Sequence, residues 1–440
     1  MPRMSSCEWC APKAPSAAKH QLRRVSPAPR ERRTRRYRLI MDFSHSERTR
    51  EYLDRLGAFM EEHVYPAEPV HAQQADEQGG RTEATPILQT LKREAKDQGL
   101  WNLFLPDAEY GPGLAYVEYA PLAEMMGRSI ELAPEATNCS APDTGNMEVI
   151  HEFGTDEQKE RWLAPLLDGE IRSCFSMTEP DVASSDPRNL ETSIIGNGDE
   201  YVIDGTKWWS TGGISADCKV AIVMGVSRPE APPKERYSMI LVPMDSEGVE
   251  VVRDLPVFGY HDRGGHAEIR YNQVRVEASN LIAGEGAGYM IAQARLGPGR
   301  IHHSMRSIGM AERAFDLMVA RAKERTAFGG PIAEQGVVQD WIAEARWRID
   351  QARLLVLYTA WLLDTVGNRE ARREISAIKV VAPRMMLWVL DKAIQIHGGA
   401  GVSDDTPLAR MWAHGRTLRI ADGPDEVHQM VIARREIGRD

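Results

Sequence analysis

The sequence predicts an α+β protein that is mostly helical, with an N-terminal helical domain, a middle β-barrel-like domain and a C-terminal four-helix bundle. Two observations predict this fold class. Apolar residues recur at helical spacing up to about residue 170 and again from about residue 288, whereas short apolar runs bounded by turn residues fill the region between. The chain has 440 residues, a length at which more than one packed domain is expected.

The N-terminal helical domain is expected over residues 41–170. Met41 is expected to open its first helix, and Leu56 and Phe59 belong to an apolar face at helical spacing. Thr155 begins the sequence Thr-Asp-Glu-Gln, a capping box that predicts the start of a short helix.

The middle β domain is expected over residues 171–287. Its strands are predicted from runs of apolar and β-branched residues at 200–207, 220–224, 239–242, 249–252 and 267–276. Gly284, Gly286 and Gly288 lack the G-x-G-x-x-G spacing of a dinucleotide-binding fold, so they are interpreted as a linker.

The C-terminal bundle is expected over residues 288–440. Long helices that are apolar on one side predict a bundle. The clearest apolar stripe consists of Ile375, Ile378, Ala382, Met385, Val389, Ala393 and Ile396. Two glycines, Gly398 and Gly399, follow this stripe and predict the end of its helix.

Residues 1–40 differ sharply in charge from the rest of the chain. They hold 11 Lys or Arg and two acids, so their net charge is +9, whereas the whole chain has a net charge of -10. The segment is expected to be a disordered basic extension. Translation upstream of the true start at Met41 is the favoured interpretation, and a transit peptide or a basic arm for polyanions are the alternatives.

The hydrophobicity, charge and cysteine content also indicate which compartment and which partners to expect. No apolar run approaches the roughly 20 residues that span a bilayer, and the acidic body is expected to repel nucleic acid. The five cysteines are too few and scattered for a disulfide framework, and Cys7-x-x-Cys10 has no second pair to complete a metal site. We therefore expect no metal and a cytoplasmic protein, or one of the mitochondrial matrix if the source is eukaryotic.

The most informative stretch is residues 174–186, where a predicted strand runs into a turn rich in Thr, Ser and small residues. Hydroxyls and free backbone N–H groups in such a turn suit a pyrophosphate or the edge of a flavin, although any polar turn has the same composition. A second segment, residues 207–213, places two tryptophans beside hydroxyls after another strand.

Together these segments resemble the acyl-CoA dehydrogenase family, whose helix–β–helix order also matches. The resemblance implies FAD as the cofactor. It places Phe175, Met177, Thr178, Ser184, Ser185, Trp209, Ser210 and Thr211 at the flavin or its pyrophosphate. The turn is one residue longer than in the family, so Ser184 and Ser185 are hard to tell apart. One of them, matched to Ser185, is also expected at the acyl-CoA.

Two later motifs resemble family segments that contact FAD across a subunit interface. Arg325 and Phe328 lie in Arg-Thr-Ala-Phe-Gly, and Gln395, Gly398 and Gly399 lie in Gln-Ile-His-Gly-Gly-Ala-Gly. The glycines let the backbone approach a phosphate closely. The resemblance therefore implies a homodimer or homotetramer.

Arg300 matches a family arginine near the acyl-CoA, and its alternative is a solvated cation at the start of a helix. Most relatives have an aspartate three residues earlier, where this chain has Gly297. The neighbouring pair His302-His303 lacks a second pair for a metal, so surface or substrate-channel roles are favoured.

The family reaction removes a proton from the α carbon of an acyl-CoA and passes a hydride from the β carbon to flavin N5, which gives a trans-2-enoyl-CoA. The base in most relatives is the glutamate of a Glu-Gly-Thr triplet. Here the triplet is Asp422-Gly423-Pro424, so the resemblance implies Asp422 as the base and Gly423 beside FAD. Burial is expected to strengthen the base. The alternative is that Asp422 only caps the helix that follows.

Asp422 and the residues around it also resemble one branch of the family, whose human members fuse a kinase-like domain to the dehydrogenase. This chain resembles the dehydrogenase half. The resemblance implies the breakdown of 4-hydroxy or long-chain fatty acids, with an electron-transfer flavoprotein as the acceptor. The alternatives are an acyl-CoA oxidase or nitroalkane oxidase of the same fold, and a non-catalytic scaffold that binds acyl-CoA.

Overall fold

The computed structural model describes residues 44–78, 83–261 and 264–438. The predictions for residues 1–40 and for Met41 lie outside these ranges. All described residues from His45 onward belong to one compact unit, so the three domain boundaries set from the sequence stay predictions. None of the helices in the described ranges has an apolar stretch long enough to cross a membrane.

The N-terminal part is helical, as predicted. Ser46 caps the first helix by accepting a hydrogen bond from the backbone N–H of Thr49, and Thr155 forms the expected capping box with Gln158. The helices are α1 (Glu47–Phe59), α2 (Tyr65–Glu77), α3 (Pro86–Asp97), α4 (Tyr116–Gly127), α5 (Ala133–Ala136), α6 (Asp143–Phe153), α7 (Asp156–Gln158) and α8 (Ala164–Leu167), with π-helical turns at Met60–Val64 and Lys159–Leu163.

A curled sheet follows, in the order β1-β4-β2-β3-β7-β6, with β5 paired to β4. Its strands are β1 (Arg172–Ser176), β2 (Ser193–Asn197), β3 (Glu200–Thr211), β4 (Cys218–Val226), β5 (Tyr237–Pro243), β6 (Val249–Asp254) and β7 (His266–Glu277). Each strand predicted from the sequence is present. Most neighbours are antiparallel, but β1 lies parallel to β4.

Strand β4 shows how the sheet joins the helices. Val220, Ile222 and Met224 belong to the large core shared with the helices, whereas Ala221 and Val223 belong to a separate core on the other side of the sheet. Successive side chains of a strand point to opposite faces, so a continuous apolar run is expected for a strand that is buried on both faces.

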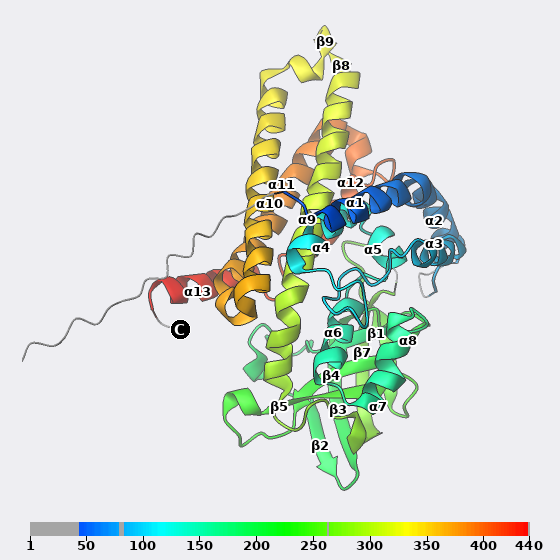
Figure 1. The fold of residues 1–440 in the computed structure, drawn as a ribbon, viewed down its shortest axis with the longest axis vertical. Coiled ribbons are helices and arrows are strands. Elements are labelled where there is room, and N and C mark those ends of the chain that lie inside the picture. The colour runs from blue at the N-terminus through cyan, green and yellow to red at the C-terminus, as the bar shows by residue number, and fades with distance from the viewer. Residues whose placement is uncertain (1–43, 79–82, 262–263, 439–440) are drawn as a thin grey trace, which may run out of the picture. The chain divides into compact units, whose positions relative to one another are not determined.

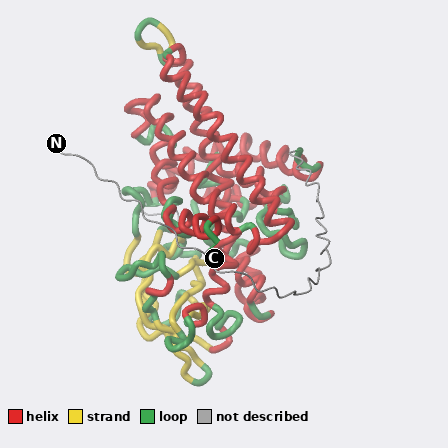
Figure 2. The backbone as a smooth tube through the Cα atoms, turned by 90° about the vertical axis from the view of Figure 1, so that its left-hand side faces the viewer, coloured by secondary structure: helices red, strands yellow, loops and turns green. Residues whose placement is uncertain are grey.

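The C-terminal part consists of long helices (Figure 1). They are α9 (Gly288–Glu324), α10 (Gly336–Glu370), α11 (Arg372–His397), α12 (Leu408–Thr417) and α13 (Asp425–Glu436), and the small hairpin β8 (Thr326–Ala327) and β9 (Gly330–Pro331) joins α9 to α10. Figure 2 shows the strands of the sheet gathered at one end of the compact unit and the hairpin at the other. The predicted fold class is confirmed.

The start of α9 corrects one detail of the sequence analysis. The helix begins at Gly288 and continues through Pro298, so Arg300 lies inside a helix rather than at its start. Proline removes one backbone hydrogen bond and usually breaks a helix. Here packing along the rest of a 37-residue helix outweighs that local preference.

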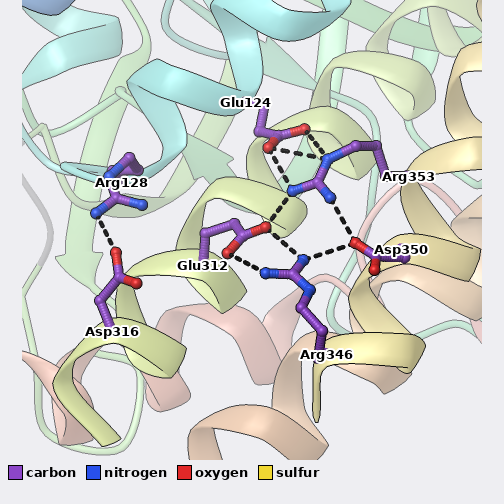
Figure 3. Close-up of polar contacts among 7 residues, drawn as sticks. All are labelled: Glu124, Arg128, Glu312, Asp316, Arg346, Asp350 and Arg353. Atoms are coloured by element: carbon purple, nitrogen blue, oxygen red, sulfur yellow. Dashed lines mark hydrogen bonds and ion pairs between the residues drawn. The ribbon is translucent and has the colours of Figure 1, made fainter. Parts of the chain in front are cut away.

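An ion-pair network ties the N-terminal helices to the bundle (Figure 3). Arg353 of α10 contacts Glu124 of α4 at 2.8 Å, Asp350 of its own helix at 3.0 Å, and Glu312 of α9. Arg346 contacts Glu312 at 2.7 Å and Asp350 at 2.8 Å. The network thereby joins α4 to the bundle helices α9 and α10.

Candidate active site

Asp422 lies in the loop between α12 and α13, and its side chain faces α9. Its Oδ2 atom is 3.5 Å from Nε2 of His303, and the side chain is 19% exposed. A Cβ atom added to Gly299 would lie 3.6 Å from the same oxygen, an ordinary contact distance, so the carboxylate lies against this part of α9. Asp422 has a φ of +55°, which is uncommon outside glycine and typical of functional positions.

The structure does not support a capping role for Asp422. The N-cap of α13 is Pro424, and no side chain caps it. Asp425 lies in the first turn of α13 and is buried in ion pairs with Arg384 and Arg419, each at 2.8 Å. The carboxylate of Asp422 is therefore available for chemistry.

Several donors fix the backbone on both sides of Asp422. Arg300 Nε donates to the Asp422 carbonyl at 3.0 Å, and His428 Nε2 donates to the same oxygen at 3.2 Å. Buried Lys379 donates to the carbonyls of Leu418 and Gly423. The view of Arg300 as a solvated cation is thus wrong, because its guanidinium is partly buried and holds the loop.

Gly423 is required for this arrangement. Its φ is +101°, in the region that favours glycine, and an added Cβ atom would lie 3.0 Å from Nε2 of His428. A side chain there would push His428 away from the Asp422 carbonyl.

Burial was expected to strengthen the base by raising its pKa, but the overall shift in the pKa of Asp422 is downward. Burial raises the pKa of Asp422, but His303, Arg295, Lys379 and Arg300 together lower it below its ordinary value. Burial also lowers the pKa of His303 to about 3, so its imidazole is neutral near pH 7. The carboxylate stays ionised in an electropositive pocket.

The two segments matched to the flavin lie side by side. Trp208 N–H donates to the carbonyl of Thr178 at 3.0 Å, and the Thr178 hydroxyl donates to the carbonyl of Trp208 at 2.7 Å. Phe175 lies in β1 and Met177 directly after it; the two are separated by one residue and are both partly accessible. Trp209, with a φ of +55°, exposes 41% of its surface beside them.

A buried ion pair that the sequence analysis missed supports this surface. Lys207 is fully buried, and its Nζ lies 2.8 Å from Oε1 of Glu179 and donates to the Met177 carbonyl at 2.9 Å. Glu179 also accepts hydrogen bonds from the backbone N–H groups of Glu191 and Thr192. Burial raises the pKa of Glu179, but Lys207 and these N–H groups lower it overall.

The structure shows which of the serine and threonine hydroxyls predicted near FAD are accessible and which are already engaged. Ser184 Oγ is engaged with the backbone of Glu179, whereas Ser185 is exposed. Ser210 is fully buried, with its hydroxyl 2.9 Å from that of Ser176, and Thr211 contacts His266 at 3.0 Å. Ser185 and Thr211 are therefore better placed than Ser184 and Ser210 to reach a bound molecule.

Arg295 links the β1 surface to the carboxylate. Its guanidinium packs over the Phe175 ring at 4.0 Å, its Nε donates to Oδ1 of Asn146 at 3.1 Å, and its charge acts on Asp422. The accessible rings and the carboxylate thus border one region.

The remaining predicted contacts lie elsewhere. Arg325 and Phe328 follow the last turn of α9, about 33 Å along the helix from His303. Gln395, Gly398 and Gly399 are exposed at the end of α11, about 24 Å or more from Lys379. One chain therefore does not bring these five residues to the Asp422 region.

The residues near Asp422 fit the flavin part of FAD. A flat ring needs an apolar face and hydrogen-bonding groups at its edge, and Phe175, Met177 and Trp209 supply the first while Thr178 and Thr211 supply the second. The glycines at the end of α11 have open space around them, which suits an approaching phosphate.

The helical–β–helical fold, and residues that fit a flavin, agree with the class of flavoprotein dehydrogenases. Three family models cover the chain: the N-terminal domain of acyl-CoA dehydrogenase at residues 46–170, the middle domain at 174–274 and the C-terminal domain at 286–437. The chain belongs to the acyl-CoA dehydrogenase family. It is an oxidoreductase that acts on CH–CH groups.

Individual relatives agree with this assignment. The chain is 57% identical to Probable acyl-CoA dehydrogenase FadE2 of Mycobacterium tuberculosis, over 91% of this chain and 98% of that protein. It is 54% identical to Acyl-CoA dehydrogenase family member 11 of Gallus gallus, over 90% of this chain but only 51% of that protein. A solved structure from Mycobacterium abscessus has a TM-score of 0.87 and 51% identity, and the match covers 90% of this chain and all of that one.

Proposed function

We propose that the protein oxidises an acyl-CoA thioester to the trans-2-enoyl-CoA, with Asp422 as the base that takes the α proton. The observation that carries the proposal is the position of the Asp422 carboxylate. It is ionised, aimed at α9 rather than capping α13, and it borders the ring-binding surface of β1.

The residues around Asp422 suit proton abstraction next to a carbonyl. No acceptor in the described part of the chain takes up the backbone N–H of Asp422, so it is free to stabilise the negative charge that develops on the thioester oxygen. The positive charges of Arg295, Arg300 and Lys379 also stabilise negative charge on this thioester oxygen. FAD, when bound, supplies the acceptor for the hydride that leaves the β carbon.

An aspartate is one methylene shorter than the glutamate of most relatives. The loop compensates by its conformation, because Arg300 of α9 and His428 both donate to the carbonyl of Asp422 and so hold this residue close to α9. The base is thereby brought to the substrate by the backbone rather than by side-chain length.

The CoA arm is expected to pass Ser185 and Arg300. Gly297 replaces a family aspartate here, and any side chain at this position would collide with the amide of Asn368, which comes from the end of α10. We infer that the Asn368 amide, which fills this space, meets the CoA arm where relatives have a carboxylate.

A complete FAD site requires a second copy of the chain. Phe328 at the β8–β9 hairpin is 99% exposed, and Trp347 and Leu354, one heptad apart on α10, are also exposed. We infer a homodimer or homotetramer in which Arg325, Phe328, Gln395, Gly398 and Gly399 complete the FAD site of a neighbour.

The acyl group and the electron acceptor are the finer parts of the proposal. We infer breakdown of 4-hydroxy or long-chain acyl groups, with transfer of electrons to an electron-transfer flavoprotein, in the cytoplasm or, in a eukaryote, the mitochondrial matrix. These inferences rest on the branch of the family that the Asp422 motif resembles.

The experiment is anaerobic mixing of the FAD-loaded protein with a panel of acyl-CoA thioesters, followed by absorbance of the oxidised flavin. Bleaching by wild type and at least a thousandfold slower bleaching by Asp422→Asn support the proposal. Equal rates would show that Asp422 is not the base. Rapid reoxidation by oxygen would indicate an oxidase, and bleaching by a nitroalkane but by no acyl-CoA would indicate a nitroalkane oxidase. If no compound bleaches the flavin, the scaffold alternative gains support.

A further inference from the structure

A cavity of about 260 Å³ lies beside the candidate active site, between α6, α9 and the loop before α4. Arg295 and Glu148 both line it. Arg295 lies one helical turn, about 6 Å, from Gly299, where an added Cβ atom would lie 3.6 Å from the Asp422 carboxylate. The cavity therefore begins a few carbon–carbon bonds from the atom at which the proposed base works.

Glu148 is a buried carboxyl group that the proposed chemistry does not use. Both of its oxygens are buried, and neither has a hydrogen-bond partner in the described part of the chain. A buried polar group without a partner costs about 1–3 kcal/mol, so such a group needs an explanation. Burial is also the main reason that the pKa of Glu148 rises to about 8, which leaves the group protonated near pH 7.

Arg295 offers the complementary groups. Its Nε is taken by Asn146, and its plane packs on Phe175. Within the described ranges, its two terminal amino groups donate no hydrogen bond that would occupy them, and Glu148 lies too far away for an ion pair with it. The cavity thus has a carboxyl that can accept or donate and a guanidinium that donates.

We propose that Glu148 and Arg295 form a subsite for a hydroxyl group on the acyl chain. A hydroxyl can donate to a Glu148 oxygen and accept from Arg295, so it satisfies both at once. The proposal rests on the proposed function, because the hydroxyl must belong to the acyl-CoA that Asp422 deprotonates.

The charges of the cavity favour a neutral hydroxyl over an anion. Its lining also includes Glu152 and Asp107, and Asp107 is paired with His151 at 2.9 Å. Three carboxyl groups face one arginine and one histidine, so a carboxylate at the end of the acyl chain would be repelled by Glu152 and by any ionised fraction of Glu148. A wholly apolar chain would leave Glu148 and Arg295 unsatisfied.

The test compares acyl-CoA thioesters of one chain length that are unsubstituted, hydroxylated at successive carbons beyond C3, or terminated by a carboxylate. The rate of flavin reduction is measured for wild type, Glu148→Leu and Glu148→Gln, with Glu152→Gln as the matched control in the same cavity. Wild type should favour one hydroxyl position by about tenfold in kcat/KM. Glu148→Leu should lose that preference, whereas Glu148→Gln and Glu152→Gln should keep most of it.

The outcomes separate this subsite from the proposed function. If unsubstituted acyl-CoA is oxidised and no hydroxyl position is favoured, or if Glu148→Leu keeps the preference, the subsite is wrong and the dehydrogenase stands. A preference for the carboxylate also overturns the subsite. If no thioester reduces the flavin, both the hydroxyl subsite and the proposed function are wrong. Binding of the favoured compound to Asp422→Asn and to Asp422→Asn/Glu148→Leu, measured by calorimetry, should show the same tenfold loss of affinity without turnover.

Discussion

The Nε2 atom of His303 lies 3.5 Å from the Oδ2 atom of Asp422, one turn along α9 from Gly299. Arg306 Nη2 lies 3.5 Å from the other ring nitrogen of His303. Because arginine only donates, Nδ1 accepts and the proton of the neutral ring resides on Nε2. His303 is thus oriented as a neutral donor toward the base.

Replacement of His303 should therefore alter the base without abolishing FAD binding. His303→Leu should lower kcat about tenfold with a smaller change in KM, and it should move the acid limb of the kcat profile to higher pH, because loss of a donor raises the pKa of the carboxylate. His303→Gln retains a donor and should restore part of the rate. An unchanged pH profile in His303→Leu would mean that the histidine only fills space.

The pH dependence of Asp422 itself follows from its lowered pKa. The folded-state pKa lies below the ordinary value of 3.8, so the group contributes stability above its unfolded pKa that is lost as pH falls through the folded value. We expect no loss of kcat through this carboxylate between pH 8 and pH 5. A stopped-flow profile of flavin reduction with an acid limb near pH 6 would contradict this, with Glu152→Gln as a control for the neighbouring carboxyl.

The buried pair Lys207 and Glu179 should control flavin retention. Lys207→Met leaves a buried carboxylate without its partner, which typically costs about 3–5 kcal/mol. The turn at residues 177–185 should loosen and release FAD. The double variant Lys207→Met/Glu179→Gln removes both charges and should recover much of the stability. Urea unfolding and the flavin-to-protein absorbance ratio measure the two effects, and equal losses in the single and double variants would exclude the pair as the cause.

The motifs that were readable in the sequence are those made by neighbours in the chain. Asp422-Gly423, the turn after β1 and the strand ends could be located because a short segment carries each of them. The partners of Asp422 could not, since His303, Lys379 and Arg300 come from α9 and α11 and meet only when these helices pack. The surface role considered for His302 was wrong for the same reason, because it packs among the rings of Phe104, Tyr116 and Tyr119.

The boundaries of helices were harder to predict than their existence. The pattern Leu-Gly-Pro-Gly at residues 296–299 predicts a break, because each of its last three residues disfavours a helix. The structure instead has α9 unbroken across it, and at Gly297 the side chain of Asn368 occupies the space that a Cβ atom would take. Tertiary packing of α9 therefore outweighs the local preference of these residues.

The ion-pair network around Arg353 should contribute measurably to stability. Arg353→Ala removes contacts to three carboxylates that are between 15% and 50% exposed, and a loss of about 1–3 kcal/mol in the free energy of unfolding is expected. The matched control is Arg321→Ala, whose ion pair with the exposed Glu324 lies within α9 and should contribute less than about 0.5 kcal/mol. Equal effects in chemical denaturation would show that the network adds nothing beyond separate surface pairs.

Glu148 should make stability depend on pH in the opposite direction from Asp422. Its folded pKa of about 8 lies above its ordinary value of 4.5, so the folded state holds a proton that the unfolded state releases, and stability falls as pH rises from about 5 to 8. Glu148→Gln cannot ionise. We expect the variant to unfold at nearly the wild-type urea concentration at pH 5 and to be more stable at pH 8, by on the order of 1 kcal/mol or more. Glu152→Gln serves as the control, because its carboxyl is less buried. A gain for Glu148→Gln that is the same at both pH values would show that Glu148 is already ionised at pH 5, and that Arg295 stabilises the carboxylate more strongly than burial disfavours it.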